Sequence, residues 1–161
     1  MPNLLPYDRT AAITYATKWA LKRNPNYYSF DKLGGDCTNF ISQCLYAGAK
    51  RMNYTPTFGW YYNSASSRSP SWTGALFLNR FLKSNLSTGP HAVITERLNV
   101  TPGDLIQLQN GAGNIYHSLF ILSVDENDIL IAAHDDDSLY RPLSTYNYAN
   151  AIFIKITGVG P

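Results

Sequence analysis

The 161-residue sequence contains only two cysteines, Cys37 and Cys44, and no clustered run of lysine and arginine. Two cysteines do not build a disulfide framework, so the sequence leaves the redox compartment open. With a net charge of only +2 and no basic patch, a nucleic-acid-binding function is not expected. No run of about 18 apolar residues occurs, which argues against a transmembrane helix and against membrane insertion.

Targeting signals and repeats are also missing. The opening stretch MPNLLPYDRT lacks the basic head and apolar run of a secretory signal, and we find no internal repeat or low-complexity segment. Hydrophobic residues make up 45% of the chain and charged residues 15%, so we expect one globular domain over residues 1–161. The 14% share of aromatic residues suggests an aromatic-lined surface, although tyrosine-rich loops can also be structural.

Helical periodicity marks the first part of the chain. Residues 8–22 carry apolar side chains on one face at helical spacing, and Asp8 can cap the start. Residues 36–47, DCTNFISQCLYA, show the i, i+3, i+4, i+7 pattern of a buried stripe, with Asp36 as N-cap. Gly48 is a suitable residue to end this second helix.

The remaining chain changes from loop to strand character. Residues 49–73 are predicted as a loop rich in aromatic and small polar residues, 74–84 as a third helix, and 85–100 is ambiguous. Short apolar runs separated by turn residues predict four strands: LIQLQ (105–109), YHSLFILSV (116–124), ILIAAH (129–134) and AIFIKI (151–156). Helices first and strands later indicate an α+β fold.

The second helix places Cys37 in its first turn, directly behind Gly-Gly-Asp. Unpaired amides give a helix N-terminus about half a positive charge, so a thiol there is expected to have a lowered pKa. The same amides can hold the oxyanion that forms when a carbonyl is attacked. The alternative is that Cys37 is a small apolar residue at the head of the buried stripe. Cys44 is assigned to the core, about 10 Å along the helix and too far from Cys37 for a disulfide.

A nucleophilic cysteine needs a base, and the chain offers three histidines. His91 has loop neighbours and is predicted to be a solvated surface residue. His117 stands at the mouth of one apolar strand, and His134 ends the next strand in a matching position. Each of these two is either a satisfied core group or a site residue.

The strand register decides which polar group lies near His117. If residues 126–127 form a two-residue turn, paired residue numbers sum to 253, His117 faces Asp136, and His134 lies diagonally on the same side. A longer turn shifts the register by one and brings Asp135 opposite instead. The group that orients the base therefore stays open among His134, Asp135 and Asp136.

Six segments in this order resemble the bacterial putative amidase domain, a distant relative of the NlpC-type and CHAP-type papain-like cell-wall hydrolases. The segments are YDRTAAITYATKWALKRNPNY, GGDCTNFISQCLYAGA, SPSWT, PGDLIQLQ, YHSLFILS and AAHDDDS. The resemblance implies a papain-like fold, with a nucleophile helix packed on a short antiparallel sheet that carries the base. It implies Cys37 as nucleophile, His117 as base and His134 as the third polar residue, with an acidic residue often found at the position of Asp137.

The function implied by the resemblance is hydrolysis of amide bonds in bacterial peptidoglycan peptides or at their junction with the glycan, without cofactor or metal. A monomer is expected, with an extracellular or cell-wall location, and an excised domain, a phage lysin or an exported toxin would explain the missing signal. Trp60 and Trp72 are candidates for lining a substrate groove, with packing of the loop as the alternative. Asp36 is a further candidate for substrate contact, although its first interpretation is a helix cap.

Other classes of function remain open in the sequence. The run HDDD (134–137) offers one imidazole and three carboxylates, but consecutive strand residues alternate faces and could not all converge on a metal ion. A wall-polymer-binding module without catalysis would suit the aromatic loop. An acyltransferase would keep the Cys-His chemistry and change only the acceptor.

Overall fold

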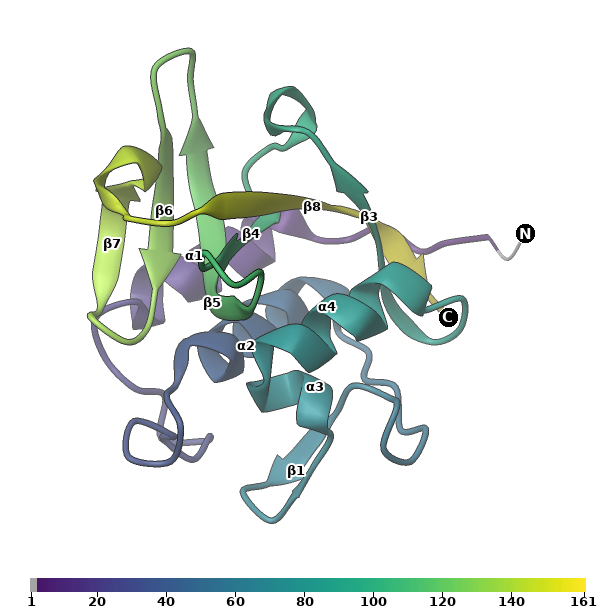
Figure 1. Ribbon diagram of the computed structural model, residues 1–161. Coiled ribbons are helices and arrows are strands. Elements are labelled where there is room, and N and C mark those ends of the chain that lie inside the picture. Colours follow the sequence, from purple (N-terminus) through teal and green to yellow (C-terminus); the bar gives the residue numbers. More distant parts are fainter. Residues whose placement is uncertain (1–2) are drawn as a thin grey trace.

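The computed structural model describes residues 3–161 and shows an α+β architecture, as the order of predicted elements indicated (Figure 1). The helices are α1 (Arg9–Trp19), α2 (Cys37–Ala49), α3 (Pro70–Thr73) and α4 (Ala75–Ser84), with short 3-10 helices η1 (Arg97–Asn99) and η2 (Leu143–Thr145). The strands are β1 (Tyr62–Ser64), β2 (Ser67–Arg68), β3 (Gly89–Thr95), β4 (Leu105–Gln109), β5 (Ile115–Val124), β6 (Ile129–Ala133), β7 (Ser138–Pro142) and β8 (Asn150–Gly160). None of the helices between residues 3 and 161 has the length and apolar character needed to span a bilayer.

Strands β3 to β8 form one antiparallel sheet of six strands in the order β3-β8-β4-β5-β6-β7. Two hydrophobic clusters cover its two faces. Phe120 and Ala132 belong to the cluster that contains α2, whereas Ile121 and Ile131 belong to the cluster that contains Leu143 of η2. In Figure 1, α2, α3 and α4 lie together below the strands, so the sheet has a helical face and a face covered mainly by loops.

Helix α2 is the central helix of this arrangement, because every residue from Thr38 to Leu45 is buried. The polar residues of this stretch make internal hydrogen bonds. Asn39 accepts from the Trp72 indole at 3.0 Å, and Ser42 donates to the Trp72 carbonyl at 2.9 Å and accepts from the Trp60 indole at 3.1 Å. The aromatic loop therefore packs onto α2, and both indoles are part of the core.

Most predicted element boundaries agree with the structure. The predicted N-cap of α1 is confirmed, and the predicted end of α2 differs. Asp8 caps α1 as predicted, since its carboxylate accepts from the Ala11 amide at 2.9 Å. Helix α2 continues through Gly48 to Ala49 and ends at Lys50, which has a φ of 60°. Gly48 is needed for packing instead, because a Cβ there would collide with the Tyr7 ring.

The β5–β6 hairpin changes register along its length. Near the turn, Val124 faces Ile129, which is the register predicted for a two-residue turn. An irregularity at Leu122 then shifts the pairing, and Phe120 faces Ala132. When this shifted register is continued past the end of β6, His117 comes opposite Asp135 rather than Asp136. The shift also puts residue 134 on the helical face and residue 117 on the other face, so the predicted same-side placement of the two histidines is wrong.

The two ends of the described chain are paired with one another. Leu5 and Val159 exchange two backbone hydrogen bonds, with N–O distances of 2.7 and 2.9 Å. This pair lies beside the end of β8 on the side away from β3, because Val159 also faces Pro90 of β3. The two edge strands of the sheet are β3 and β7.

Candidate functional site

Cys37 occupies the first turn of α2, and its thiol is free and partly exposed. Gly34 and Gly35 precede it with φ angles of 85° and 101°, a backbone conformation that favours glycine. At Gly35 a side chain would also collide with the Asp135 carboxylate. These two glycines therefore allow the tight approach of the chain to the helix start, as the Gly-Gly-Asp-Cys motif suggested.

Asp36 stands at the N-cap position, but its side chain does not cap the helix. The fully buried carboxylate accepts from the Phe30 amide at 2.8 Å, from the Asn39 side chain at 2.9 Å and from His134 Nδ1 at 2.6 Å. Such a group cannot contact a substrate, so its assignments as cap and as substrate ligand are both wrong. Asp36 instead fastens the loop before α2 to the end of β6.

His134 is held at both ring nitrogens. Nδ1 faces the Asp36 carboxylate, Nε2 faces the Trp19 carbonyl oxygen at 2.8 Å, and the ring stacks on Phe40 with centroids 4.0 Å apart. Both partners are acceptors, so the arrangement fits an imidazolium that donates twice. No nitrogen of His134 is left for His117, and the structure does not bring the two histidines together.

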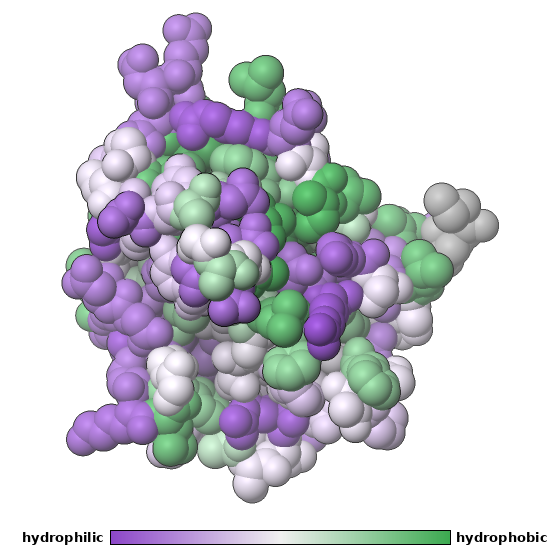
Figure 2. All heavy atoms as spheres, viewed as in Figure 1, coloured by the Kyte–Doolittle hydropathy of each residue, from purple (hydrophilic) through white to green (hydrophobic). Residues whose placement is uncertain are grey.

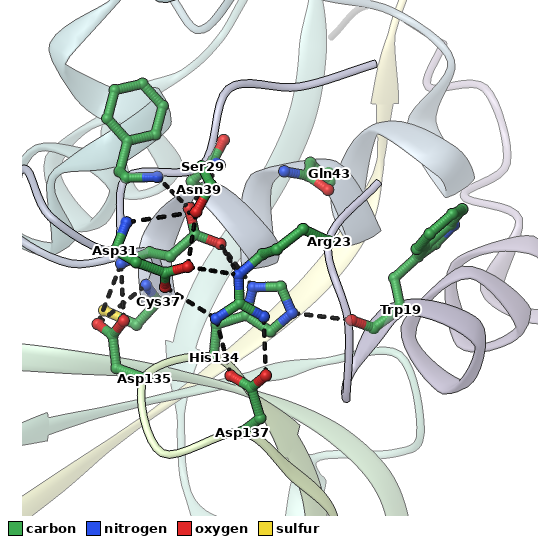
Figure 3. Close-up of polar contacts among 12 residues, drawn as sticks. Trp19, Arg23, Ser29, Asp31, Cys37, Asn39, Gln43, His134, Asp135 and Asp137 are labelled. Carbon is green, nitrogen blue, oxygen red and sulfur yellow. Dashed lines mark hydrogen bonds and ion pairs between the residues drawn. The ribbon is translucent and has the colours of Figure 1, made fainter. Parts of the chain in front are cut away.

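Asp135 satisfies the free amides at the start of α2. Its carboxylate accepts from the Asp36 amide at 2.9 and 3.1 Å and from the Cys37 amide at 3.3 Å (Figure 3). This places a carboxylate where the sequence predicted the oxyanion to bind. Asp135 has a φ of 59° and lies in the turn after β6, beyond the register shift at Leu122.

Several hydrogen-bond donors and one negatively charged group, the Asp135 carboxylate, lie near the Cys37 sulfur. The Thr38 hydroxyl lies 3.6 Å away, and the amides of Ser118 and Thr38 also favour the thiolate. Burial nevertheless raises the pKa of the Cys37 thiol above its usual value, and the negative charge of Asp135 adds to the rise. The predicted lowering of this pKa is therefore wrong, because burial outweighs the nearby donors and because Asp135 also occupies the helix N-terminus that was to stabilise the thiolate.

The sulfur lies at the edge of β5, next to the peptide bond that joins His117 and Ser118. Ile121 donates its amide to Asp104 on the β4 side, at 2.9 Å, so the amide of Ser118 points to the other edge. Strand β6 ends at Ala133, and beyond this end the Ser118 amide meets the Cys37 sulfur.

His117 differs from the other two histidines because its ring makes no hydrogen bond to the described residues. Its ring is largely buried beside Tyr116 and Tyr146, and within residues 3–161 neither of its nitrogens has a hydrogen-bond partner. Burial lowers the pKa of His117, while Asp135 raises it. The neutral ring is therefore available as a proton acceptor at neutral pH. His91, predicted to be solvated, is buried, and its Nε2 lies 2.6 Å from the Ser87 carbonyl.

The three carboxylates of the HDDD run have separate partners. Asp135 binds the helix amides, Asp136 lies near Arg141 at 3.3 Å, and Asp137 makes a bidentate pair with Arg23 at 2.8 and 2.9 Å. Arg23 also binds Asp31 at 2.8 Å. Among the described residues, no group of three or more histidine, cysteine or acidic side chains is placed to hold a metal ion.

The predicted aromatic groove is absent from the places where it was expected. Trp60 and Trp72 are fully buried, with their rings 4.8 Å apart, so they cannot line a surface. A separate hollow of about 500 Å³ lies on the face drawn in Figure 2, where hydrophobic side chains gather over α4 and β3. Its lining includes Leu76, Asn79, Ile94 and Ile152, and none of the predicted catalytic residues.

Substitution of Asp135 by Asn is expected to lower the pKa of the Cys37 thiol, because a negative charge beside the sulfur is removed. At pH 7 the thiolate fraction then rises, and alkylation by iodoacetamide should become several-fold faster. The rate measured between pH 6 and 10 gives the midpoint directly. Asp136→Asn is the matched control, since this neighbouring carboxylate is 90% exposed and bonds to Arg141. Equal profiles for the two variants would contradict the role given to Asp135.

These features define an α+β protein with a free thiol at a helix start, next to a strand that carries an unbonded imidazole. The chain belongs to the putative amidase domain family, whose model matches residues 6–157, and the family's name points to hydrolysis of amide bonds. It is similar to YhbB of Bacillus subtilis, an uncharacterized protein, with 39% identity over 140 residues. That match covers 84% of this chain and 43% of YhbB, so the chain spans less than half of that relative.

A second relative is similar over a shorter segment. YjcM of Bacillus subtilis, also uncharacterized, is 57% identical over 49 residues, which cover 30% of this chain and 11% of YjcM. No solved structure matches the chain.

Proposed function

We propose that this protein is a cysteine-dependent hydrolase of amide bonds in bacterial peptidoglycan, with Cys37 as nucleophile and His117 as general base. The observation that carries the proposal is the position of the Cys37 sulfur against the peptide bond that follows His117. His117 is also the histidine whose ring nitrogens are free to exchange a proton, whereas His134 is held at both ends.

In the proposed reaction, His117 takes the thiol proton as the sulfur attacks the amide carbonyl carbon. The raised pKa of Cys37 and the lowered pKa of His117 favour a neutral thiol and a neutral imidazole at rest, so proton transfer accompanies the attack. The C–N bond then breaks, and the imidazolium returns its proton to the leaving amine. Water, deprotonated by His117, adds to the thioester, and breakage of the C–S bond regenerates the thiol.

The oxyanion requires a donor that the resting arrangement already uses. The Cys37 amide donates to Asp135, so in this mechanism the carboxylate gives up the amide before the amide can bind the substrate oxygen. Asp135 also faces the position of His117 in the shifted register, and its charge favours the imidazolium. We assign Asp135, rather than His134, as the third polar residue of the proposed site.

The proposed biological setting follows from the resemblance to NlpC-type and CHAP-type hydrolases and from the antiparallel sheet packed on the nucleophile helix. We infer a papain-like fold for residues 1–161, a monomeric state, action without a cofactor, and an extracellular or cell-wall location. Peptidoglycan or its stem peptides are the proposed substrates.

Mass spectrometry of fragments released from purified cell walls tests the proposed function. A free stem peptide would indicate cleavage at the glycan junction, and a cut cross-bridge would indicate an endopeptidase. Release that persists in the Cys37→Ala variant would contradict the cysteine mechanism. Retention on insoluble walls without released fragments would favour a binding module, and transfer to an added amine without hydrolysis would favour an acyltransferase.

A further inference from the structure

A chain of buried polar side chains runs from α4 across the helical face of the sheet to the Cys37 thiol. Its members come from four different elements and are 0–5% exposed. They are, in order, Asn79 on α4, Gln107 on β4, Ser118 on β5 and Thr38 on α2. Successive members are 3.1 Å apart, and the last hydroxyl lies 3.6 Å from the sulfur.

The direction of the first bonds is fixed by a backbone carbonyl. Gln107 places Nε2 2.9 Å from the carbonyl oxygen of Ala75, which can only accept, so the amino group of the side chain must lie on that side. Its Oε1 then accepts from Asn79, and the second hydrogen of Nε2 is directed to the Ser118 hydroxyl oxygen. Every hydrogen of this amino group is therefore used.

The two hydroxyls extend this direction to the sulfur. Ser118 accepts from Gln107, so its own hydrogen is free for Thr38, which lies 3.1 Å away. Thr38 can accept that hydrogen, and its one other polar side-chain partner within residues 3–161 is the Cys37 sulfur. In this arrangement the Thr38 hydrogen is free to be donated to the sulfur.

We infer that Asn79, Gln107, Ser118 and Thr38 form a polarised hydrogen-bond chain that directs the Thr38 hydroxyl at the Cys37 sulfur. The chain makes Thr38 a positioning residue that holds the thiol at the edge of β5 and stabilises its anion. Aligned donors in a low-dielectric interior strengthen one another. The inference rests on the proposed role of Cys37 as nucleophile, and it names four residues that act on that nucleophile from inside the protein.

Three groups other than the chain also influence the thiol. Asp135 approaches from the β6–β7 turn, and the amides of Ser118 and Thr38 approach from β5 and α2. His117 is the titratable residue next to Ser118 on β5. Asp136 and Arg141 influence the pKa of His117. These groups are unchanged in the variants below, so a shift in the thiol profile reports the hydroxyl.

The test is the pH dependence of iodoacetamide alkylation in a Cys44→Ala background, where Cys37 is the single thiol. Thr38→Val removes the hydroxyl and keeps the shape, and we expect alkylation at pH 7.5 to slow about tenfold, since a hydrogen bond to a charged group is lost. Thr38→Ser should restore the original profile. Ser42→Ala is the matched control, because it deletes a buried hydroxyl of the same helix that belongs to a different network.

Two results would overturn the inference. One is a Thr38→Val profile that equals that of Ser42→Ala. If Thr38→Val does not fold, the test is Ser118→Ala, for which we expect alkylation to slow a few-fold. An unchanged alkylation profile in Ser118→Ala is the second result that would overturn the inference. Alkylation needs no amide substrate, so failure of the proposed hydrolase activity and failure of the chain are separate outcomes.

Discussion

The Cys37→Ala variant is expected to lose amide hydrolysis by at least about 10³-fold, because removal of a nucleophile leaves only binding and polar stabilisation of the substrate. The variant should fold normally, since the thiol is partly exposed and holds no other element in place. Activity is measured as release of new amino groups from purified peptidoglycan, with circular dichroism as the check on folding.

Cys44→Ala provides the matched control for this prediction. Cys44 is completely buried in the middle of the same helix, so its loss leaves a small cavity and is expected to cost about 1 kcal/mol of stability. Hydrolysis should persist in this variant. If Cys37→Ala retained the activity of the unaltered protein, Cys37 would be a core residue at the head of a helix, and the proposed mechanism would be withdrawn.

The largest effect on stability is expected for Asp36→Ala. The change leaves the Phe30 amide, the Asn39 side chain and the His134 ring without their shared partner inside the protein. Removal of one member of a buried ion pair typically costs about 3–5 kcal/mol, because the other charge stays buried and unpaired. Urea unfolding followed by tryptophan fluorescence measures this loss, since Trp60 and Trp72 are in the core.

Asp137→Ala is the appropriate comparison, because Asp137 also pairs with a cation through two hydrogen bonds but is partly exposed. Exposed pairs contribute about 1 kcal/mol or less, so this variant should remain close to the original protein in its free energy of unfolding. A similar loss in both variants would show that Asp36 is not the internal anchor described above.

The place of Cys37 at a helix start could be predicted from the sequence because its determinants are local. Two glycines, an acidic residue and helical periodicity stand within a few residues of Cys37, and each acts over one turn of chain. The destination of the Asp36 side chain could not be predicted in this way. Its partner His134 is 98 residues away, and a helix cap is the usual role for an aspartate at that position.

The hairpin register shows the same division. Near its tip the hairpin has the register of a two-residue turn, one of the two alternatives that the sequence left open, but the irregularity at Leu122 leaves no mark in an apolar run and moves His134 to the other face. Strand β7 was missed because Ser138–Pro142 is a half-exposed edge strand without apolar alternation. Trp60 and Trp72 were candidates for a groove, with packing as the alternative, because aromatic content alone does not distinguish a groove from a core.

One sign of the buried hydrogen-bond chain is visible in the predicted strands. Gln107 and Ser118 are polar residues within two runs that otherwise indicate buried strands. Buried polar side chains are costly unless they are bonded, so their presence in such runs points to an internal network. That this network ends at the Cys37 thiol could not be predicted, because it depends on how α2 packs against β5.

The pairing of Leu5 with Val159 has a consequence for how this fold can be joined to other modules. Both segments of that pair leave the molecule together at the end of β8, while the start of α2, which carries Cys37, lies near Asp135 in the β6–β7 turn at the other side of the sheet (Figure 1). Linkers attached next to this pair would emerge side by side, away from the side of the molecule that carries Cys37. The fold could therefore be joined to other modules at both ends without covering the thiol.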